Sequence, residues 1–556
     1  MVIWQSTLIL LISTLCFISG TLAHEPQTVA SAQGHASDTV PLYDNLGNLT
    51  YPISTANEVT QRYFNQGLRL TYAFNHAEAQ RSFRAAQRHD PACAMCFWGE
   101  AFVLGPNINA AMDTTATHPA VAAMRRAKEL APRASEREQA LIEALSARYT
   151  DDPAADRQTL NQAYAEAMAK AATRFPDDDE IAILYVDALM NLAPWDYWEA
   201  DGTTPKGKIA EAIQTAEKVL VRNPDHPGAI HLYIHLTEAS ATPERAEGYA
   251  ERLAALMPGA GHIVHMPSHT FFRVGRYHDS AETNKAAVQA DEAYLARVNH
   301  RGMYAYGYYP HNIHFVLISA QMAGDAKTAL DYARRLEGKI PTEVAAQSGW
   351  IQAIVPAPYF AHVQFSPPDT ILALPDPGDA FPFVKAMWHY ARGEAFAMQG
   401  EVEKASKEAA QIAEITQQTG SQYPPDLAQV APDVLRIARH VVEGRIAQAQ
   451  NDLTRAIKEF RIAVAIQDAL PYLEPPFWYY PVRQSLGAAL LAAGKPQEAE
   501  QAFEASLRQF PKNGWALYGL MTAQQALGKE RAAQETALRF KQAWAGDPDS
   551  IRLKRL

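Results

Sequence analysis

The sequence predicts an all-α protein built as an α-solenoid, a stack of helix-turn-helix units. At 556 residues the chain is too long for one small hydrophobic core, which favours several domains or an array of repeats. Hydrophobic residues make up 48% of the chain and charged residues 20%, which is typical of a globular protein. Almost no stretch alternates between apolar and polar residues, so few strands are expected. The remaining observation is a spacing of small residues, phenylalanine and proline that recurs along the chain.

One unit of this repeat is outlined by Gly67, Ala79, Phe83, Ala86 and Pro91, at offsets of 12, 16, 19 and 24 from the glycine. The same offsets recur in two further sets: Gly444, Ala456, Phe460 and Ala463, and then Gly487, Ala499, Phe503, Ser506 and Pro511. Small residues let two helices approach, phenylalanine fills the space between neighbours, and proline ends the second helix. The pattern resembles the tetratricopeptide repeat (TPR) family. This resemblance implies a superhelix of antiparallel helix pairs with a concave groove.

The resemblance covers most of residues 57–545, with looser units in the middle of the chain. The expected parts are an N-terminal TPR array at 57–340, an insertion at 341–385, a C-terminal TPR array at 386–545 and a tail at 546–556. The insertion is rich in proline and aromatic residues and is not expected to form regular helix. It and two smaller inserts, at 295–309 and 471–482, are either lids over a binding site or ordered elbows.

The N-terminus predicts export. Residues 8–20 are an apolar run followed by Thr21-Leu22-Ala23, so residues 1–23 are expected to be a signal peptide cleaved after Ala23, although the leader carries no Lys or Arg. Residues 24–55 are expected to be a loose lead-in. No later stretch is long enough to span a membrane. The mature chain is therefore predicted to be secreted or periplasmic.

The charge balance limits the partners. The formal net charge is −11 and no long run of Lys and Arg occurs, so nucleic acid is not expected as a partner. A small molecule or a peptide in the concave groove is the open alternative to metal ions as the bound partner.

Histidines are concentrated in the motifs HLYIH, GHIVHMPSH and PHNIH, at spacings of three and four residues. They are His231, His235, His262, His265, His269, His311 and His314. In the TPR family the second, fifth and ninth residues of the first helix face the groove, and these histidines fill seven of the nine such places in three units. Two of them follow two others by 34 residues, so stacked units should bring them side by side. The sequence predicts that the seven histidines bind metal ions, with ordinary polar lining of the groove as the alternative.

The ligand types favour a transition metal. Seven imidazoles are enough for two ions, so a dinuclear centre is plausible, and imidazole suits copper, zinc or iron better than magnesium or calcium. We favour copper. Glu238, three residues after His235, is a candidate ligand, orienting residue or general base. Four tyrosines just before PHNIH are candidates for gating, hydrogen bonding or electron relay, with packing as the alternative: Tyr304, Tyr306, Tyr308 and Tyr309.

Cys93 and Cys96 form a CxxC motif in an early unit. No histidine follows Cys96, which excludes covalent attachment of c-type haem through this motif. A local disulfide is favoured because the expected compartment is oxidising, and a redox-active dithiol or a second, softer metal site remain as alternatives.

The sequence therefore predicts an exported TPR-solenoid protein that binds one or two transition-metal ions, with a metalloenzyme favoured. Redox chemistry at copper or iron is preferred to zinc-assisted hydrolysis. A non-catalytic metal-binding or delivery protein and a TPR protein–protein interaction scaffold are the alternatives. No phosphate-binding loop, nucleophile elbow or HExxH motif supports another chemistry.

Overall fold

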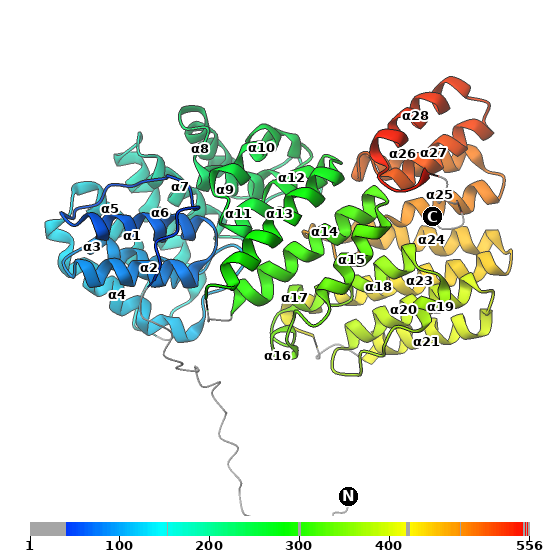
Figure 1. The fold of residues 1–556 in the computed structure, drawn as a ribbon, viewed down its shortest axis with the longest axis horizontal. Helices are drawn as coiled ribbons and strands as arrows, with labels where there is room; N and C mark the ends of the chain where they lie inside the picture. The colour runs from blue at the N-terminus through cyan, green and yellow to red at the C-terminus, as the bar shows by residue number, and fades with distance from the viewer. Residues whose placement is uncertain are drawn as a thin grey trace, which may run out of the picture. The chain divides into compact units, whose positions relative to one another are not determined.

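A computed structural model describes residues 40–152, 154–298, 302–418, 423–478, 480–548, 551, 553 and 556, all within a compact unit formed by Val40–Leu556. These residues fold into helices with two isolated β-bridges and no β-sheet (Figure 1). The predicted all-α fold is confirmed. None of the helices is both long and apolar enough to cross a membrane in the part of the chain described. The predicted signal peptide at 1–23 and the first part of the lead-in lie outside the described residues.

The N-terminal part of the array is a run of helices that pack on their sequence neighbours. They are α1 (Glu58–Tyr72), α2 (His76–His89), α3 (Ala94–Val103), α4 (Thr117–Leu130), α5 (Glu136–Ser146), α6 (Arg157–Arg174), α7 (Asp179–Met190) and α8 (Ile209–Arg222), with short 3₁₀ turns at Thr114–Ala116 and Ala131–Arg133. Side-chain caps begin several of them. Asn57, for example, accepts the backbone N–H groups of Val59 and Thr60 at the start of α1, which satisfies donors that the helix itself leaves free.

The middle helices carry the histidine motifs. They are α9 (Pro227–Thr237), α10 (Glu247–Leu256), α11 (Gly261–His265), α12 (Pro267–Arg273), α13 (Tyr277–Leu295), a π-helix (Tyr304–Tyr308), α14 (Tyr309–Ala323) and α15 (Ala326–Leu336), with a 3₁₀ turn at Pro243–Ala246. Pro267 divides α11 from α12 because it has no backbone N–H to donate. The buried apolar residues form two clusters, and both α12 and the segment 304–309 contribute residues to each cluster. The histidine motifs therefore lie where the two halves of the core meet.

The remaining helices form the insertion and the C-terminal part. They are α16 (Thr342–Ala345), α17 (Gly349–Ile354), α18 (Ala357–Phe365), α19 (Pro368–Leu372), α20 (Pro382–Met398), α21 (Val402–Gln418), α22 (Pro425–Ala428), α23 (Ala431–Ala449), α24 (Leu453–Ala469), α25 (Val482–Ala492), α26 (Pro496–Gln509), α27 (Gly514–Ala526) and α28 (Glu530–Ala543). The expectation that residues 341–385 lack regular helix is wrong, because four short helices form there. Pro368 and Pro382 stand at the first position of their helices, where a missing N–H costs nothing.

The repeat spacing has the packing role that the sequence assigned to it. A Cβ atom on Gly67 would lie 2.6 Å from the ring of Phe83, and one on Gly444 would lie 2.7 Å from the ring of Phe460. Each glycine thus lets a helix approach the phenylalanine of its partner helix closely. Alanines at the crossing positions, such as Ala79 and Ala456, are fully buried. The small residues and phenylalanines therefore hold the helix pairs together.

The lead-in is less loose than expected. Its described part has no helix, yet the backbone N–H of Tyr43 donates to Gln66 Oε1 at 2.8 Å and that of Tyr51 donates to Asn65 Oδ1 at 3.1 Å. Tyr51 is buried. Side-chain amides of α1 thus hold this segment against the array, a contact that composition alone does not reveal.

Candidate metal centre

Six of the seven histidines form two groups of three in the interior. Group A consists of His231 and His235 from α9 with His262 from α11, and group B consists of His265 from α11, His269 from α12 and His311 from α14. In each group the three candidate ligand nitrogens lie within 4.8 Å of one another. All six side chains are buried, with at most 7% exposed. The predicted pairing across stacked units is present, since the rings of His235 and His269 lie 5.4 Å apart.

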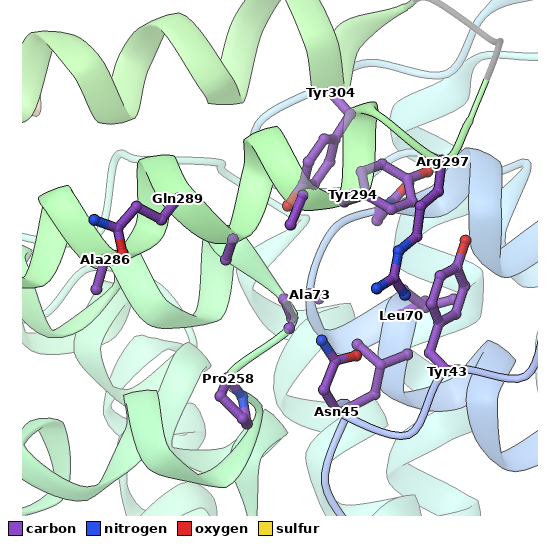
Figure 2. A pocket seen from close by; sticks show the side chains of 16 residues that line it. Tyr43, Asn45, Leu70, Ala73, Pro258, Ala286, Gln289, Tyr294, Arg297 and Tyr304 are labelled. Atoms are coloured by element: carbon purple, nitrogen blue, oxygen red, sulfur yellow. The ribbon is translucent and has the colours of Figure 1, made fainter.

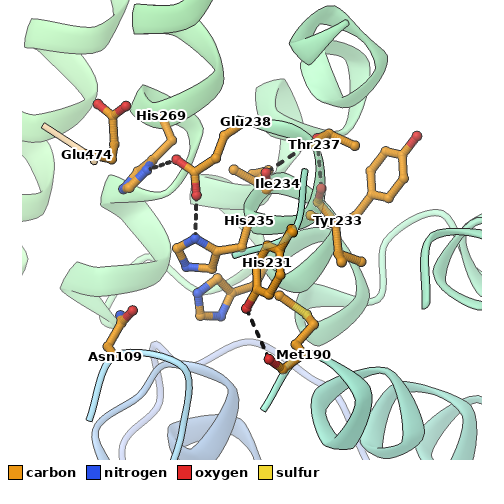
Figure 3. Close-up of polar contacts among 12 residues, drawn as sticks. Asn109, Met190, His231, Tyr233, Ile234, His235, Thr237, Glu238, His269 and Glu474 are labelled. Atoms are coloured by element: carbon orange, nitrogen blue, oxygen red, sulfur yellow. Dashed lines mark hydrogen bonds and ion pairs between the residues drawn. The ribbon is translucent and has the colours of Figure 1, made fainter. Parts of the chain in front are cut away.

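Fixed acceptors hold the Nδ1 atoms of four of these imidazoles. Nδ1 of His231 lies 2.6 Å from the carbonyl oxygen of Tyr72, and Nδ1 of His265 lies 2.6 Å from Asn284 Oδ1. Nδ1 atoms of His235 and His269 lie 2.6 and 2.5 Å from the two carboxylate oxygens of Glu238 (Figure 3). Because these oxygens can only accept, Nδ1 must carry the proton, which leaves Nε2 with its lone pair.

The Nε2 atoms then face one another. In group B, Nε2 of His265 lies 2.7 Å from Nε2 of His269 and 3.2 Å from Nε2 of His311. In group A, Nε2 of His231 lies 3.2 Å from Nε2 of His262. Two lone pairs at such distances repel each other unless a cation, either a proton or a metal ion, lies between them. Imidazoles fixed through Nδ1 with Nε2 atoms converging are the usual arrangement of a histidine metal site.

Burial keeps most of these imidazoles neutral. It lowers the pKa of four histidines well below the ordinary value of 6.5, and neighbouring imidazoles lower it further: His231, His262, His265 and His311. Burial also lowers the pKa of His235. For His269 burial acts in the same direction, but the Glu238 carboxylate outweighs it and the pKa is raised. Within group B, His269 is therefore the histidine most inclined to hold a proton, and in the other five histidines burial favours the neutral form that can bind a metal.

A phenylalanine covers each group. The ring of Phe74 lies 4.5 Å from that of His231 and 5.3 Å from that of His262. The ring of Phe315 lies 4.8 Å from that of His265 and 5.0 Å from that of His269. These apolar rings exclude water from one side of each group, which strengthens electrostatic interactions inside it.

A half-buried tryptophan lies at the edge of each group. The ring of Trp195 is 5.2 Å from that of His235, and the ring of Trp350 is 6.1 Å from that of His311. Each group therefore has an aromatic side chain between it and the surface.

Glu238 contacts one histidine of each group. Both of its carboxylate oxygens face Nδ1 atoms of histidines, one in each group, and the residue is fully buried. Burial opposes ionisation, but His269 and His235 together lower the pKa of Glu238. Of the three roles the sequence left open, these hydrogen bonds match the orienting one, and Glu238 also forms a possible ligand group with His235 and His269.

His314, Tyr308 and Tyr309 lie in different places relative to the two groups. His314 is buried on α14 but belongs to neither group. The ring of Tyr308 lies 4.6 Å from that of His262, so this tyrosine is at the centre. Tyr309 points elsewhere, since its hydroxyl donates to Glu292 Oε1 at 2.8 Å and its ring lies under Lys339. The side chains of consecutive helix residues point to different faces, so only one of these two tyrosines can reach the histidines.

Several residues that lie near the histidine groups are not predicted by the sequence pattern. Tyr472 and Glu474 come from the insert at 471–482, and the Tyr472 hydroxyl lies 3.1 Å from Glu238 Oε2 and 2.5 Å from Glu474 Oε2. Figure 3 shows Glu474 near His269. Burial, the main cause, raises the pKa of Glu474. Nothing in the sequence indicates that this distant insert reaches the histidines.

Cys93 and Cys96 are joined by a disulfide and are buried at the start of α3. Glu100, on the same helix, accepts hydrogen bonds from Arg84 and Gln87. Two oxidised cysteines have no thiolate for a metal, so this arrangement corresponds to the disulfide and not to a second metal site.

The C-terminal part contains a different kind of cavity, of about 880 Å³. Arg445 and Tyr480 line it and both donate to the carbonyl oxygen of Leu556, at 2.7 and 2.8 Å, as does the Ser485 hydroxyl. Leu556 is fully buried there. Three side chains thus donate to one oxygen of residue 556, whose backbone N–H donates to the carbonyl oxygen of Leu553.

Comparisons with known proteins agree with the repeat assignment. The family model described as tetratricopeptide repeat matches residues 490–556. No curated protein sequence matches the chain. Solved structures similar to it include the human IFIT1 dimer with m7Gppp-AAAA (12% identity, TM-score 0.32, 88% of this chain and 91% of that chain covered) and yeast Tom70 (10%, 0.29, 87% and 92%). The P58(IPK) TPR domain is another (11%, 0.20, 85% and 99%). At these scores the likeness supports no argument about function.

Proposed function

We propose that this chain, which belongs to the tetratricopeptide-repeat family, is an exported oxidoreductase that holds two transition-metal ions, copper by preference. One ion would bind to group A and the other to group B. The observation that carries the proposal is the pair of three-histidine groups whose Nε2 atoms converge while fixed acceptors hold Nδ1. Six imidazoles with no carboxylate ligand suit copper better than magnesium, calcium or a di-iron centre rich in carboxylates.

The protein's own residues do three things at this site. The histidines would bind the ions, and burial favours the neutral, binding form in five of them, whereas the Glu238 carboxylate favours the protonated form of His269. Tyr72, Glu238 and Asn284 orient four of the six rings. Phe74 and Phe315 exclude water. When bound, two adjacent copper ions would supply two one-electron acceptors.

Elemental analysis of protein expressed with metal supplementation tests the proposal. The proposal is supported if the wild-type chain contains two copper ions and a His235→Ala/His265→Ala variant contains none. A centre that retains only zinc would favour the hydrolytic reading, and stoichiometric copper without any redox turnover would favour metal delivery. A purified chain that binds no transition metal tightly would refute it.

The C-terminal cavity favours a second candidate function, that of an interaction scaffold. A TPR array is a scaffold suited to protein interaction. The hydrogen bonds from Arg445, Tyr480 and Ser485 to the oxygen of Leu556 support the C-terminal end of a peptide as the ligand. A variant that ends at residue 545 should bind a labelled peptide of residues 546–556, and Arg445→Met should abolish that binding. Equal binding by both variants would exclude this cavity as the site.

A further inference from the structure

A second cavity lies next to the histidine centre without being lined by any of its imidazoles. It measures about 370 Å³, within the usual range for sites that bind small molecules. Tyr43, Tyr294 and Tyr304 supply aromatic walls, and Arg297 supplies a cation (Figure 2). Several of the remaining lining residues are alanines, which leave a flat space beside the rings. Arg297 is exposed while Tyr304 is buried, so the cavity leads inward from the surface.

Tyrosine rings connect this cavity to group A. The ring of Tyr294 lies 5.3 Å from that of Tyr304, and the ring of Tyr304 lies 5.9 Å from that of Tyr308. Tyr308 in turn lies 4.6 Å from His262, and the backbone N–H of His262 donates to the Tyr304 hydroxyl at 3.4 Å. Tyr304 and Tyr308 are the two ends of the π-helix, whose wider turn places residues four apart next to each other. A continuous series of rings thus joins the cavity to a ligand of the centre.

We infer that this cavity binds a single-ring dihydroxybenzene that carries a carboxylate, and that its electrons reach the metal centre through Tyr304 and Tyr308. The inference rests on the proposed function, because the electrons need a redox metal as acceptor. Arg297 would pair with the carboxylate, and the ring would lie against Tyr294 and Tyr304. The donor is oxidised to a quinone and loses two electrons and two protons. Two Cu(II) ions, if held by groups A and B, would accept these electrons, one each, and the protons leave to water at the exposed mouth beside Arg297.

Binding of the donor and transfer of its electrons depend on different residues. Recognition requires Arg297, so an uncharged donor of the same shape should bind poorly. Transfer requires the phenol rings of Tyr304 and Tyr308, whereas Tyr306, in the same π-helix, is not part of the series. Tyr306 is therefore a matched control for changes to this segment.

The experiment is a single turnover of the copper-loaded, full-length protein under anaerobic conditions. The donors are 2,5-dihydroxyphenylacetate and methylhydroquinone, and stopped-flow absorbance follows the quinone. Elemental analysis gives the copper content of every variant beforehand. We expect one quinone per chain, a Tyr304→Phe/Tyr308→Phe variant with full copper that reacts about tenfold or more slowly, and an unchanged rate in Tyr306→Phe. In the metal-free chain, Arg297→Gln should raise the dissociation constant of 2,5-dihydroxyphenylacetate, measured by equilibrium titration, about tenfold and leave that of methylhydroquinone unchanged.

Each failure has a distinct meaning. If the wild-type chain takes up no copper, the proposed function fails and this inference fails with it. If copper is bound but the double tyrosine variant reacts at the wild-type rate, the relay alone is refuted. If Arg297→Gln leaves the dissociation constants of both donors for the metal-free chain unchanged, the cavity is not the donor site.

Discussion

Replacement of Glu238 by glutamine would test whether one buried carboxylate orients both metal sites. In the wild-type chain its two oxygens accept from Nδ1 of His235 and from Nδ1 of His269, at 2.6 and 2.5 Å. Glutamine has the same shape but only one acceptor oxygen, and its amide group is a donor. One of the two imidazoles must then move its proton to Nε2, the atom that would bind the metal. Glu238→Gln should therefore weaken one site strongly and the other little.

The magnitude follows from the loss of one orienting partner. Such a loss typically costs about 10- to 100-fold in metal affinity, or about 1.4 to 2.7 kcal/mol. Asn284→Leu should weaken group B alone by a similar factor, because Asn284 orients His265 only. Glu474→Gln is the matched control, since Glu474 is a nearby half-buried carboxylate with no hydrogen bond to the six histidines among the contacts described.

Copper titration against a competing chelator measures both affinities. Trp195 and Trp350 flank different groups, at 5.2 Å from His235 and 6.1 Å from His311, so Cu(II) bound to each group should quench its own tryptophan. Comparison with Trp195→Phe and Trp350→Phe assigns each affinity to a group. The reasoning is refuted if Glu238→Gln retains both wild-type affinities, or if Glu474→Gln weakens either site as much.

Three further predictions concern protons and packing. The pKa of Asp291 is raised by burial to about 7, so its contribution to stability is full below its ordinary pKa of 3.8 and is lost as the pH rises through about 7. Asp291→Asn should therefore flatten the stability profile between pH 4 and 7, by up to about 1.4 kcal/mol per pH unit, in urea unfolding; parallel profiles would contradict this. Gly444→Ala should lower the free energy of unfolding by about 1 to 3 kcal/mol, because its Cβ would lie 2.7 Å from the Phe460 ring. Gly248→Ala, in α10 with nothing within 4 Å, should instead stabilise by up to about 1 kcal/mol, and the same unfolding assay decides whether the two changes differ in sign.

The fold was predictable because its signals are local and repeated. Glycine at one offset and phenylalanine sixteen residues later meet in the same way in three units, as at Gly67 and Phe83. The spacing of residues within one unit fixes such contacts, so a pattern in the sequence is enough to find them. The composition of residues 341–385 does not predict their short helices, because proline interrupts a helix when it lies in the interior. Several of these prolines instead begin helices.

The histidine groups were predictable for the same reason, and their surroundings only in part. His231 and His265 occupy equivalent places in stacked units, which the 34-residue spacing reveals. Phe74, Glu474 and Trp350 reach the centre from a turn, a distant insert and a short helix that no repeat register covers. Long-range contacts of that kind leave no periodic signal in one sequence.

Asn284 is different, because the repeat does encode it. It lies 19 residues after His265, and the same offset joins His389 to Glu408 and His440 to Glu459, in each case through Nδ1. Within a helix pair, then, a histidine on the first helix is held by a polar residue at a fixed place on the second. In the C-terminal pairs that residue is a carboxylate, and His440 forms a possible ligand group with Glu443 and Glu459 and not with other imidazoles. At His265 it is a neutral amide, and other imidazoles face the opposite nitrogen. The same position of the helix pair therefore fixes, at His265, the direction of the Nε2 lone pair that faces the other imidazoles.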